Sequence, residues 1–414
     1  MANKELCLLS LLAIGLSLGP SYAFSGEHDD VVRLRTHLHP PYQVLEGREL
    51  QGSGIKALKC VFSKLNRKYK IDLSPPNRNR YLLDNEQADG IFLSLPDSEL
   101  NSIAVATQPL AIERWKFFSF EDRPLHPKRY KDNIGAVLGS SERVWLTRHD
   151  FTKVGSSTSM ENLVRVLSNR RVDYALADEN AFHIASRKAD ILPDAFHSSF
   201  VRYVPLVAYF SNEFVARNPE FIPQFNRQID FCLADSKHPT IQEKEKLQIM
   251  VQSYLDEGGW KVKLIKLIKN LAAAPTNEME KRKQDVLWVK AQKQRGKTVL
   301  MEGILSNEIS KKLAERRDFS EGNISEIFVF DPQGFILGLS QITSDYWQGD
   351  EEKYSRIFVE KLPMNFSNII FDHSTRKFQV SITVPLHDPD TGRILAGITF
   401  GLDTDLALSE YRLE

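Results

Sequence analysis

The apolar and polar positions of the first hundred residues alternate between two periods. Residues 31–38, VVRLRTHL, alternate as a half-buried strand does, and an apolar pattern of helical period follows at 55–65. YKIDLSPP (69–76) reads as a second strand, and RYLLDNEQADGIFLSLP (80–96) as a helix, a turn and a third strand. Strands that alternate with helices predict a parallel, doubly wound sheet.

The same pattern restarts further along the chain. NIGAVLGS (133–140) predicts a strand that ends in Gly-Ser, and residues 158–178 predict a helix followed by a strand. RYVPLVAYFS (202–211) predicts another strand, with a helix at 219–234. Two α/β units in series, each too small to stand alone, indicate two lobes with a cleft between them.

Residues 256–320 predict a connector of helices. WKVKLIKLIKNLA (260–272) gathers its apolar residues on one helix face, which fits either a packed surface helix or a helix lying on a membrane. A charged helix at 277–297 and a third helix at 298–317 follow.

The last segment, 321–414, is rich in strand patterns. A hairpin is expected around the turn PQG (332–334), followed by a helix near 351–361 and then three strands within 367–403. The pattern predicts an α+β domain with an antiparallel sheet and helices to one side.

The N-terminus has the form of a secretory signal peptide. Lys4 is followed by an apolar run, 6–18, which is too short for a membrane span, and small-x-small residues precede a cleavage point at Phe24. Residues 1–23 are therefore expected to be removed. We expect the exported protein to reside in the periplasm of a Gram-negative bacterium.

Charge and cysteine content narrow the classes further. Lys+Arg and Asp+Glu are equal at 54 each, which argues against a nucleic-acid binder. Cys60 and Cys232 are the cysteines that remain after cleavage. In an oxidising compartment they could form a disulfide, and two buried thiols are the alternative.

Residues 31 to about 255 resemble the family 3 periplasmic solute-binding proteins. The resemblance is carried by HPPYQVLEGRELQGSGIKAL, by ADGIFLSLPDSELNSIAVATQPLAIERWKFFSF, and by NIGAVLGSS and STSMENLVRVLSNRRVDYALADEN. It implies a two-lobed α/β fold over 24–255 with chain crossings near Phe118–Phe120 and Tyr203–Val207. Lobe 1 would comprise about 30–118 and 206–255, and lobe 2 about 119–205.

The resemblance also implies a ligand in the cleft. Tyr42 and Trp115 would form aromatic walls, and Ser140 and Thr158, which lead into helices, would offer N–H groups to a carboxylate. Asp178 stands where family members hold the amino group of the ligand. The family's usual arginine is missing from the run 97–101, DSELN, with Arg80 as a candidate substitute, so a plain α-amino acid is disfavoured and an amine is favoured.

Residues 277–414 look like a single Cache (PDC-type) sensor domain, through EIFVFDPQGFILGLSQITSDYWQGDE and FDHSTRKFQVSITVPLHDPDTGRILAGITFGLD. Its loop SDYWQGDEEKY has neither a nucleophile–base arrangement nor the spacing of a calcium loop. Two readings stay open. The loop either plugs the core with its aromatic residues, or clamps a ligand with the residues Tyr346, Trp347, Asp350 and Asp372.

The function expected from these features is that of a non-enzymatic sensor without cofactor or metal. It would bind an amino acid, an amine or a small carboxylate, and pass its occupancy to a membrane receptor. The alternative is the binding component of an ABC permease. A homodimer is compatible with the sensor reading.

Overall fold

The computed structural model describes residues 31–120, 127–128, 131–233, 237–272, 278–372 and 375–409. The expected signal peptide, 1–23, lies outside these ranges. Within them, no helix is both long enough and apolar enough to cross a bilayer.

Lobe 1 is built on a short parallel sheet. Its strands β1 (Val32–Thr36), β4 (Tyr69–Leu73) and β5 (Gly90–Ser94) pair in the order β4-β1-β5, as the alternating pattern predicts. Gly90 is required in β5 because a Cβ atom there would lie 2.9 Å from the ring of Phe210. The remaining elements of the lobe are β2 (Val44–Glu46), β3 (Glu49–Gln51), α1 (Ser53–Leu65), α2 (Pro76–Asp84), α3 (Leu100–Ile103), β6 (Ala104–Ala106), α7 (Asn212–Arg217) and α8 (Phe221–Cys232).

Lobe 2 repeats this plan. Its strands pair in parallel in the order β10-β8-β9, and β10 is buried along its whole length, which explains its continuous apolar run YALA. The elements of the lobe are β8 (Ile134–Val137), α4 (Ser141–Arg148), β9 (Val154–Ser157), α5 (Met160–Ser168), β10 (Tyr174–Asp178), α6 (Glu179–Lys188) and the 3-10 turn Pro193–Ala195.

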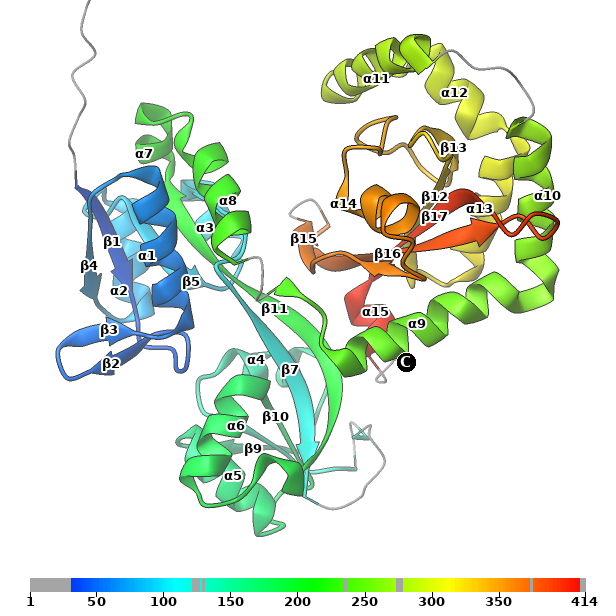
Figure 1. The fold of residues 1–414 in the computed structure, drawn as a ribbon. Coiled ribbons are helices and arrows are strands. Elements are labelled where there is room, and N and C mark those ends of the chain that lie inside the picture. Colours follow the sequence, from blue (N-terminus) through cyan, green and yellow to red (C-terminus); the bar gives the residue numbers. More distant parts are fainter. Residues whose placement is uncertain are drawn as a thin grey trace, which may run out of the picture.

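Two long antiparallel strands, β7 (Ala111–Ser119) and β11 (His197–Ser211), join the lobes (Figure 1). The C-terminal end of β11 pairs with β5 of lobe 1, whereas β7 pairs with β10 of lobe 2 from Trp115 to Phe118. The first crossing therefore lies at 111–114, not near Phe118–Phe120 as expected, because Phe118 is already inside the sheet of lobe 2. The second crossing lies near 203–206, within the predicted region.

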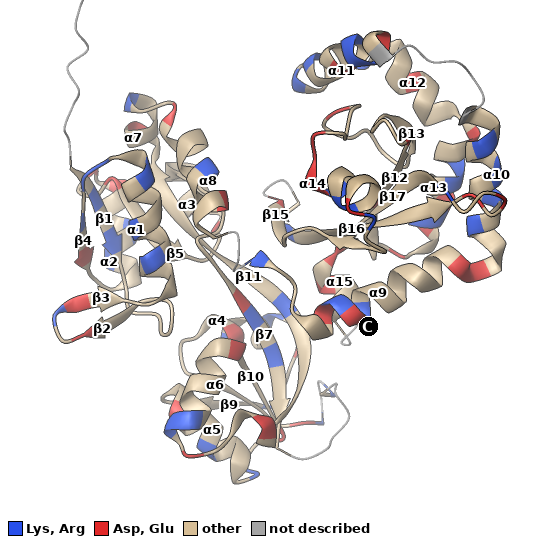
Figure 2. Cartoon of the chain, in the orientation of Figure 1, with Lys and Arg blue, Asp and Glu red and all other residues tan. Residues whose placement is uncertain are grey.

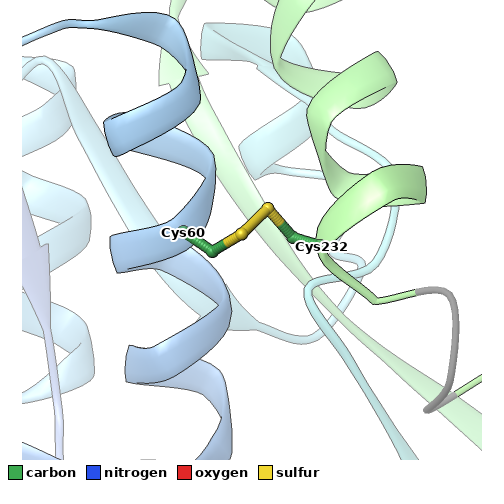
Figure 3. The surroundings of a disulfide bond; sticks show 2 residues. All are labelled: Cys60 and Cys232. Carbon is green, nitrogen blue, oxygen red and sulfur yellow. A yellow bond between two sulfur atoms is a disulfide. The ribbon is translucent and has the colours of Figure 1, made fainter.

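A disulfide ties together the two chain segments of lobe 1. Cys60 on α1 and Cys232 at the end of α8 are bonded, with Cα atoms 6.0 Å apart (Figure 3). Of the two readings of these cysteines, the structure has the disulfide. The bond closes a loop of 172 residues that contains the whole of lobe 2.

The C-terminal domain contains an antiparallel sheet of order β13-β12-β17-β16-β14, with β15 also on β16. The hairpin expected around PQG is present as β12 paired with β13. The strands are β12 (Ile324–Phe330), β13 (Ile336–Leu339), β14 (Asn365–Phe366), β15 (Ile370–Asp372), β16 (Lys377–His387) and β17 (Ile394–Asp403).

Helices cover both faces of this sheet, whereas the sequence predicted one. Alternate residues of β12 face different cores: Phe328 and Phe330 pack with Trp288, and Ile327 and Val329 pack with Leu313. The helices are α9 (Ile241–Asp256), α10 (Trp260–Ala272), α11 (Glu278–Lys293), α12 (Val299–Ser306), α13 (Glu308–Phe319), α14 (Glu352–Tyr354) with the π-turn Ser355–Val359, and α15 (Thr404–Leu408).

Helix α9 belongs to the C-terminal domain, so the boundary between the two domains lies earlier in the chain than predicted. Residues 241–255 were expected in lobe 1, but Leu247, Val251 and Leu255 are buried in the core of the C-terminal domain. The same core includes Phe200 and Tyr203 of the crossing strand β11. The two-lobed domain therefore ends near α8, and the C-terminal domain packs directly against the strands that join the lobes.

Candidate ligand-binding site

Two cavities open at the junction of the lobes, and Ser140 lines both of them. The first, of about 340 Å³, is lined by His39 and Pro40 of lobe 1, Glu113 of β7, and side chains of lobe 2 that include Glu142 and Asp178. We call it the acidic cavity. Concave sites with a few convergent polar groups are the usual place for small ligands.

Asp178, which lines the acidic cavity, accepts hydrogen bonds from groups of both lobes. Its Oδ2 caps α6 by accepting a hydrogen bond from the N–H of Ala181 at 3.0 Å. Its Oδ1 accepts from the N–H of Arg114 at 3.0 Å and from the hydroxyl of Tyr42 at 3.1 Å. Tyr42 belongs to the core of lobe 1, so this hydrogen bond joins the two lobes.

Glu113 supplies a second buried carboxylate, only 3% exposed. It accepts a hydrogen bond from Trp115 Nε1 at 2.8 Å, and its other oxygen is paired with His39 Nε2. Burial alone would lower the pKa of His39, but the hydrogen bond and the charge of Glu113 outweigh burial and raise it. The pairing with Glu113 therefore favours the protonated form of His39.

Two further carboxyl groups of the acidic cavity, Glu142 and Asp178, form no ion pair with a basic side chain of the described residues. Burial, reinforced by the charge of Glu113, raises the pKa of Glu142 to about 7 and that of Asp178 to about 7. Buried carboxyl groups with raised pKa values indicate a place where a cation would be stabilised on entry. An ammonium group in the acidic cavity would be such a cation.

The second cavity, of about 420 Å³, has the opposite charge. Its lining contains Arg148, Arg202 and Arg376 but no aspartate or glutamate, and we call it the basic cavity. Its apolar walls include Trp115 and Trp145. Figure 2 shows charged residues of both signs along β7, whereas β11 carries only a positive one.

The structure brings together four of the six residues predicted for the cleft. Asp178 and Ser140 line the acidic cavity, Trp115 lines the basic one, and Tyr42 is bonded to Asp178. Thr158 lines neither, because the chain enters α5 through Ser159, whose hydroxyl caps that helix.

Arg80 also lines neither cavity. Its guanidinium is paired with Asp97 at 2.9 Å and with Glu99 at 2.7 Å, the two acids of the run 97–101. Arg80 is therefore engaged within lobe 1 in this structure.

Sequence reasoning missed Glu113, Glu142 and the three arginines of the basic cavity. The sequence could have revealed Glu113, because a carboxylate inside the apolar strand AIERWKFF must be paired when it is buried. Arg376 carried no signal, because a contact between domains cannot be read from local pattern.

The four residues proposed as a clamp in the C-terminal domain lie in different settings. Tyr346 is buried and stacks on Trp288 at 5.6 Å, and the N–H groups of Tyr346 and Trp347 both donate to Asp285 at 2.9 Å. Asp350 is exposed, and Asp372 lies at the end of the edge strand β15.

Of the two readings of this loop, the contacts support the core plug. Its aromatic residues fill the space between α11 and the sheet.

No protein-family model matches this chain, and no curated protein sequence matches it. Solved structures give low-scoring likenesses over half of the chain. A histidine kinase sensor domain with similarity to periplasmic binding proteins shares 11% identity over 50% of this chain and 91% of its own, with a TM-score of 0.40. The GluR0 ligand-binding core in complex with L-glutamate shares 12% over 50% and 94%, with a TM-score of 0.41. Substrate-binding domain 2 of GlnP from Lactococcus lactis shares 16% over 50% and 91%, with a TM-score of 0.40.

These scores are too low to carry an argument about function. The two-lobed architecture follows from the strand order and the two crossing strands, and the ligand chemistry follows from the cavities.

Proposed function

We propose that this protein is a non-enzymatic sensor of a cationic small molecule, in which the C-terminal domain responds to the relative position of the two lobes. The ligand would enter the cleft with its ammonium group beside Asp178 and Glu142. The main support for a sensor is that the C-terminal domain contacts both crossing strands.

The attachment to β11 runs through Asp405 of α15. Its Oδ1 accepts a hydrogen bond from the N–H of Tyr203 at 3.2 Å, and its Oδ2 lies 3.5 Å from the guanidinium of Arg202. The ring of Tyr203 meets that of Phe378 of β16 edge to face at 5.6 Å. Strand β11 is thus held at the point where it leaves lobe 2.

The attachment to β7 runs through α9 and the segment before it. Arg114 donates to the carbonyl oxygen of His238 at 3.2 Å and forms an ion pair with Glu243 at 3.4 Å. Its guanidinium also lies 5.6 Å from the ring centre of Tyr203. Both crossing strands therefore contact elements of the C-terminal domain.

Lobe closure in two-lobed binding domains is a rotation about their crossing strands. When the lobes close, a domain that contacts both strands must either change those contacts or oppose the rotation. A carrier for a permease needs only the two lobes, so this attachment favours a sensor over the alternative, the binding component of an ABC transporter.

We also propose that the protein lies in the periplasm and that its partner is a membrane receptor. The disulfide supports an exported, oxidising environment such as the periplasm. A periplasmic sensor needs a membrane receptor to carry its signal inside, and a C-terminal domain of the Cache type would suit contact with such a receptor.

A thermal-shift screen tests the ligand class. We expect amines, such as cadaverine, putrescine or spermidine, to raise the melting temperature of mature residues 24–414, because a ligand that binds the native state stabilises it by mass action. Succinate and glycine betaine complete the panel, since the first lacks a cation and the second cannot donate a hydrogen bond from its cation. Stabilisation by betaine but by none of the amines would argue against pairing with the acidic cavity.

A further inference from the structure

The basic cavity is assembled from three parts of the molecule. Lobe 1 contributes Leu95 and Pro96, and lobe 2 contributes Ser141, Arg148 and other residues of α4. The C-terminal domain closes the cavity with two residues of its β15–β16 segment, Phe371 and Arg376. A molecule in this cavity would therefore touch both lobes and the C-terminal domain at once.

Among the described residues, only one of the three arginine charges in this cavity faces a carboxylate. The guanidinium groups of Arg148 and Arg376 have no ion pair or hydrogen bond with another residue of the described ranges, whereas Arg202 lies 3.5 Å from Asp405 and donates to the carbonyl oxygen of Tyr203 at 3.4 Å. Three guanidinium groups around one space repel each other, and an anion between them would replace repulsion with charge-assisted hydrogen bonds. The lining offers no carboxylate that could play this part.

Arg376 also acts on lobe 1. Burial raises the pKa of Tyr209, a residue of lobe 1, and the positive charge of Arg376 opposes that rise. The arginine of the C-terminal domain is thus close to lobe 1 as well as to the basic cavity that it lines.

We propose that the basic cavity binds a carboxylate, with Arg376 as the group through which the C-terminal domain contacts the ligand. Because Ser140 lines both cavities, a dipolar ligand could place its ammonium in the acidic cavity and its carboxylate in the basic one. The binding of an ammonium group in the acidic cavity rests on the proposed function, whereas the binding of a carboxylate in the basic cavity does not.

Calorimetric titration with succinate tests the carboxylate half, because succinate carries two carboxylates and no cation. We expect succinate to bind the mature protein, and Arg376→Gln to weaken its binding about tenfold or more, the effect of losing a hydrogen bond to a charged group. Arg393→Gln, which removes another exposed arginine of the same domain, is the matched control and should leave the affinity unchanged.

Two outcomes would overturn the proposal: no binding of succinate by the wild type, or equal affinity in Arg376→Gln and Arg393→Gln. A parallel titration with cadaverine separates this proposal from the sensor's amine chemistry. Arg376→Gln should leave cadaverine binding intact. Failure of cadaverine alone, with succinate bound and sensitive to Arg376, would overturn the amine assignment and leave the anion site standing.

Discussion

Replacing both cysteines, in a Cys60→Ser and Cys232→Ser double variant, should lower the free energy of unfolding of the two-lobed domain by about 3–5 kcal/mol. The disulfide closes a loop of 172 residues, and a cross-link over so long a loop removes much conformational entropy from the unfolded chain. Urea unfolding followed by circular dichroism would measure the loss.

A reductant supplies the control for the disulfide. Dithiothreitol should destabilise the wild type to the level of the double variant and should leave the variant itself unchanged. Equal stability of the two proteins without reductant would contradict the bond between α1 and α8.

The variant Asp178→Asn should weaken amine binding about 100-fold, because removing one partner of a buried charged pair costs several kcal/mol. Asparagine keeps an oxygen that can cap α6, so the change removes charge with little disturbance of the helix. In the wild type, affinity for the amine should rise roughly tenfold from pH 6 to pH 8. The carboxyl groups of Asp178 and Glu142, with pKa values of about 7, must ionise to pair with the ammonium.

Asp190→Asn is the matched control for this variant. Asp190 is exposed on the same lobe, just after α6, and its positive φ of 58° suits asparagine. If Asp178→Asn binds amines as tightly as Asp190→Asn, the acidic cavity does not hold the cation.

The lobes could be predicted because their pattern is local. Strands β1, β4, β5, β8, β10 and β11 follow the apolar runs and alternations that the sequence displays, and the parallel pairing within each lobe follows from the alternation of strands with helices. The short strands β2, β3, β6 and β9 were not predicted. Strand β7 was not predicted as a strand either, and only its pairing with β10 shows that lobe 2 begins at Trp115.

The residues of the candidate site also fall into those that the sequence could predict and those that it could not. Asp178 and Ser140 stand at strand ends next to helix starts, where a parallel sheet presents its ligand groups, and for Asp178 the resemblance noted in the sequence pointed to the same position. The contacts of Asp405 with Tyr203 and of Arg376 with the cleft join residues far apart in the chain. No periodicity encodes such contacts, which is why α9 was assigned to lobe 1.

If the protein is a sensor, the C-terminal domain responds to events in the cleft through the crossing strands. Hydrogen–deuterium exchange, with and without a saturating amine from the thermal-shift screen, measures that response. We expect altered exchange in α9, β16 and α15 as well as in the two lobes, with no change of either kind in Asp178→Asn. Altered exchange confined to residues 31–233, with α9, β16 and α15 unaffected, would show that the lobes close without the C-terminal domain and would contradict the sensor.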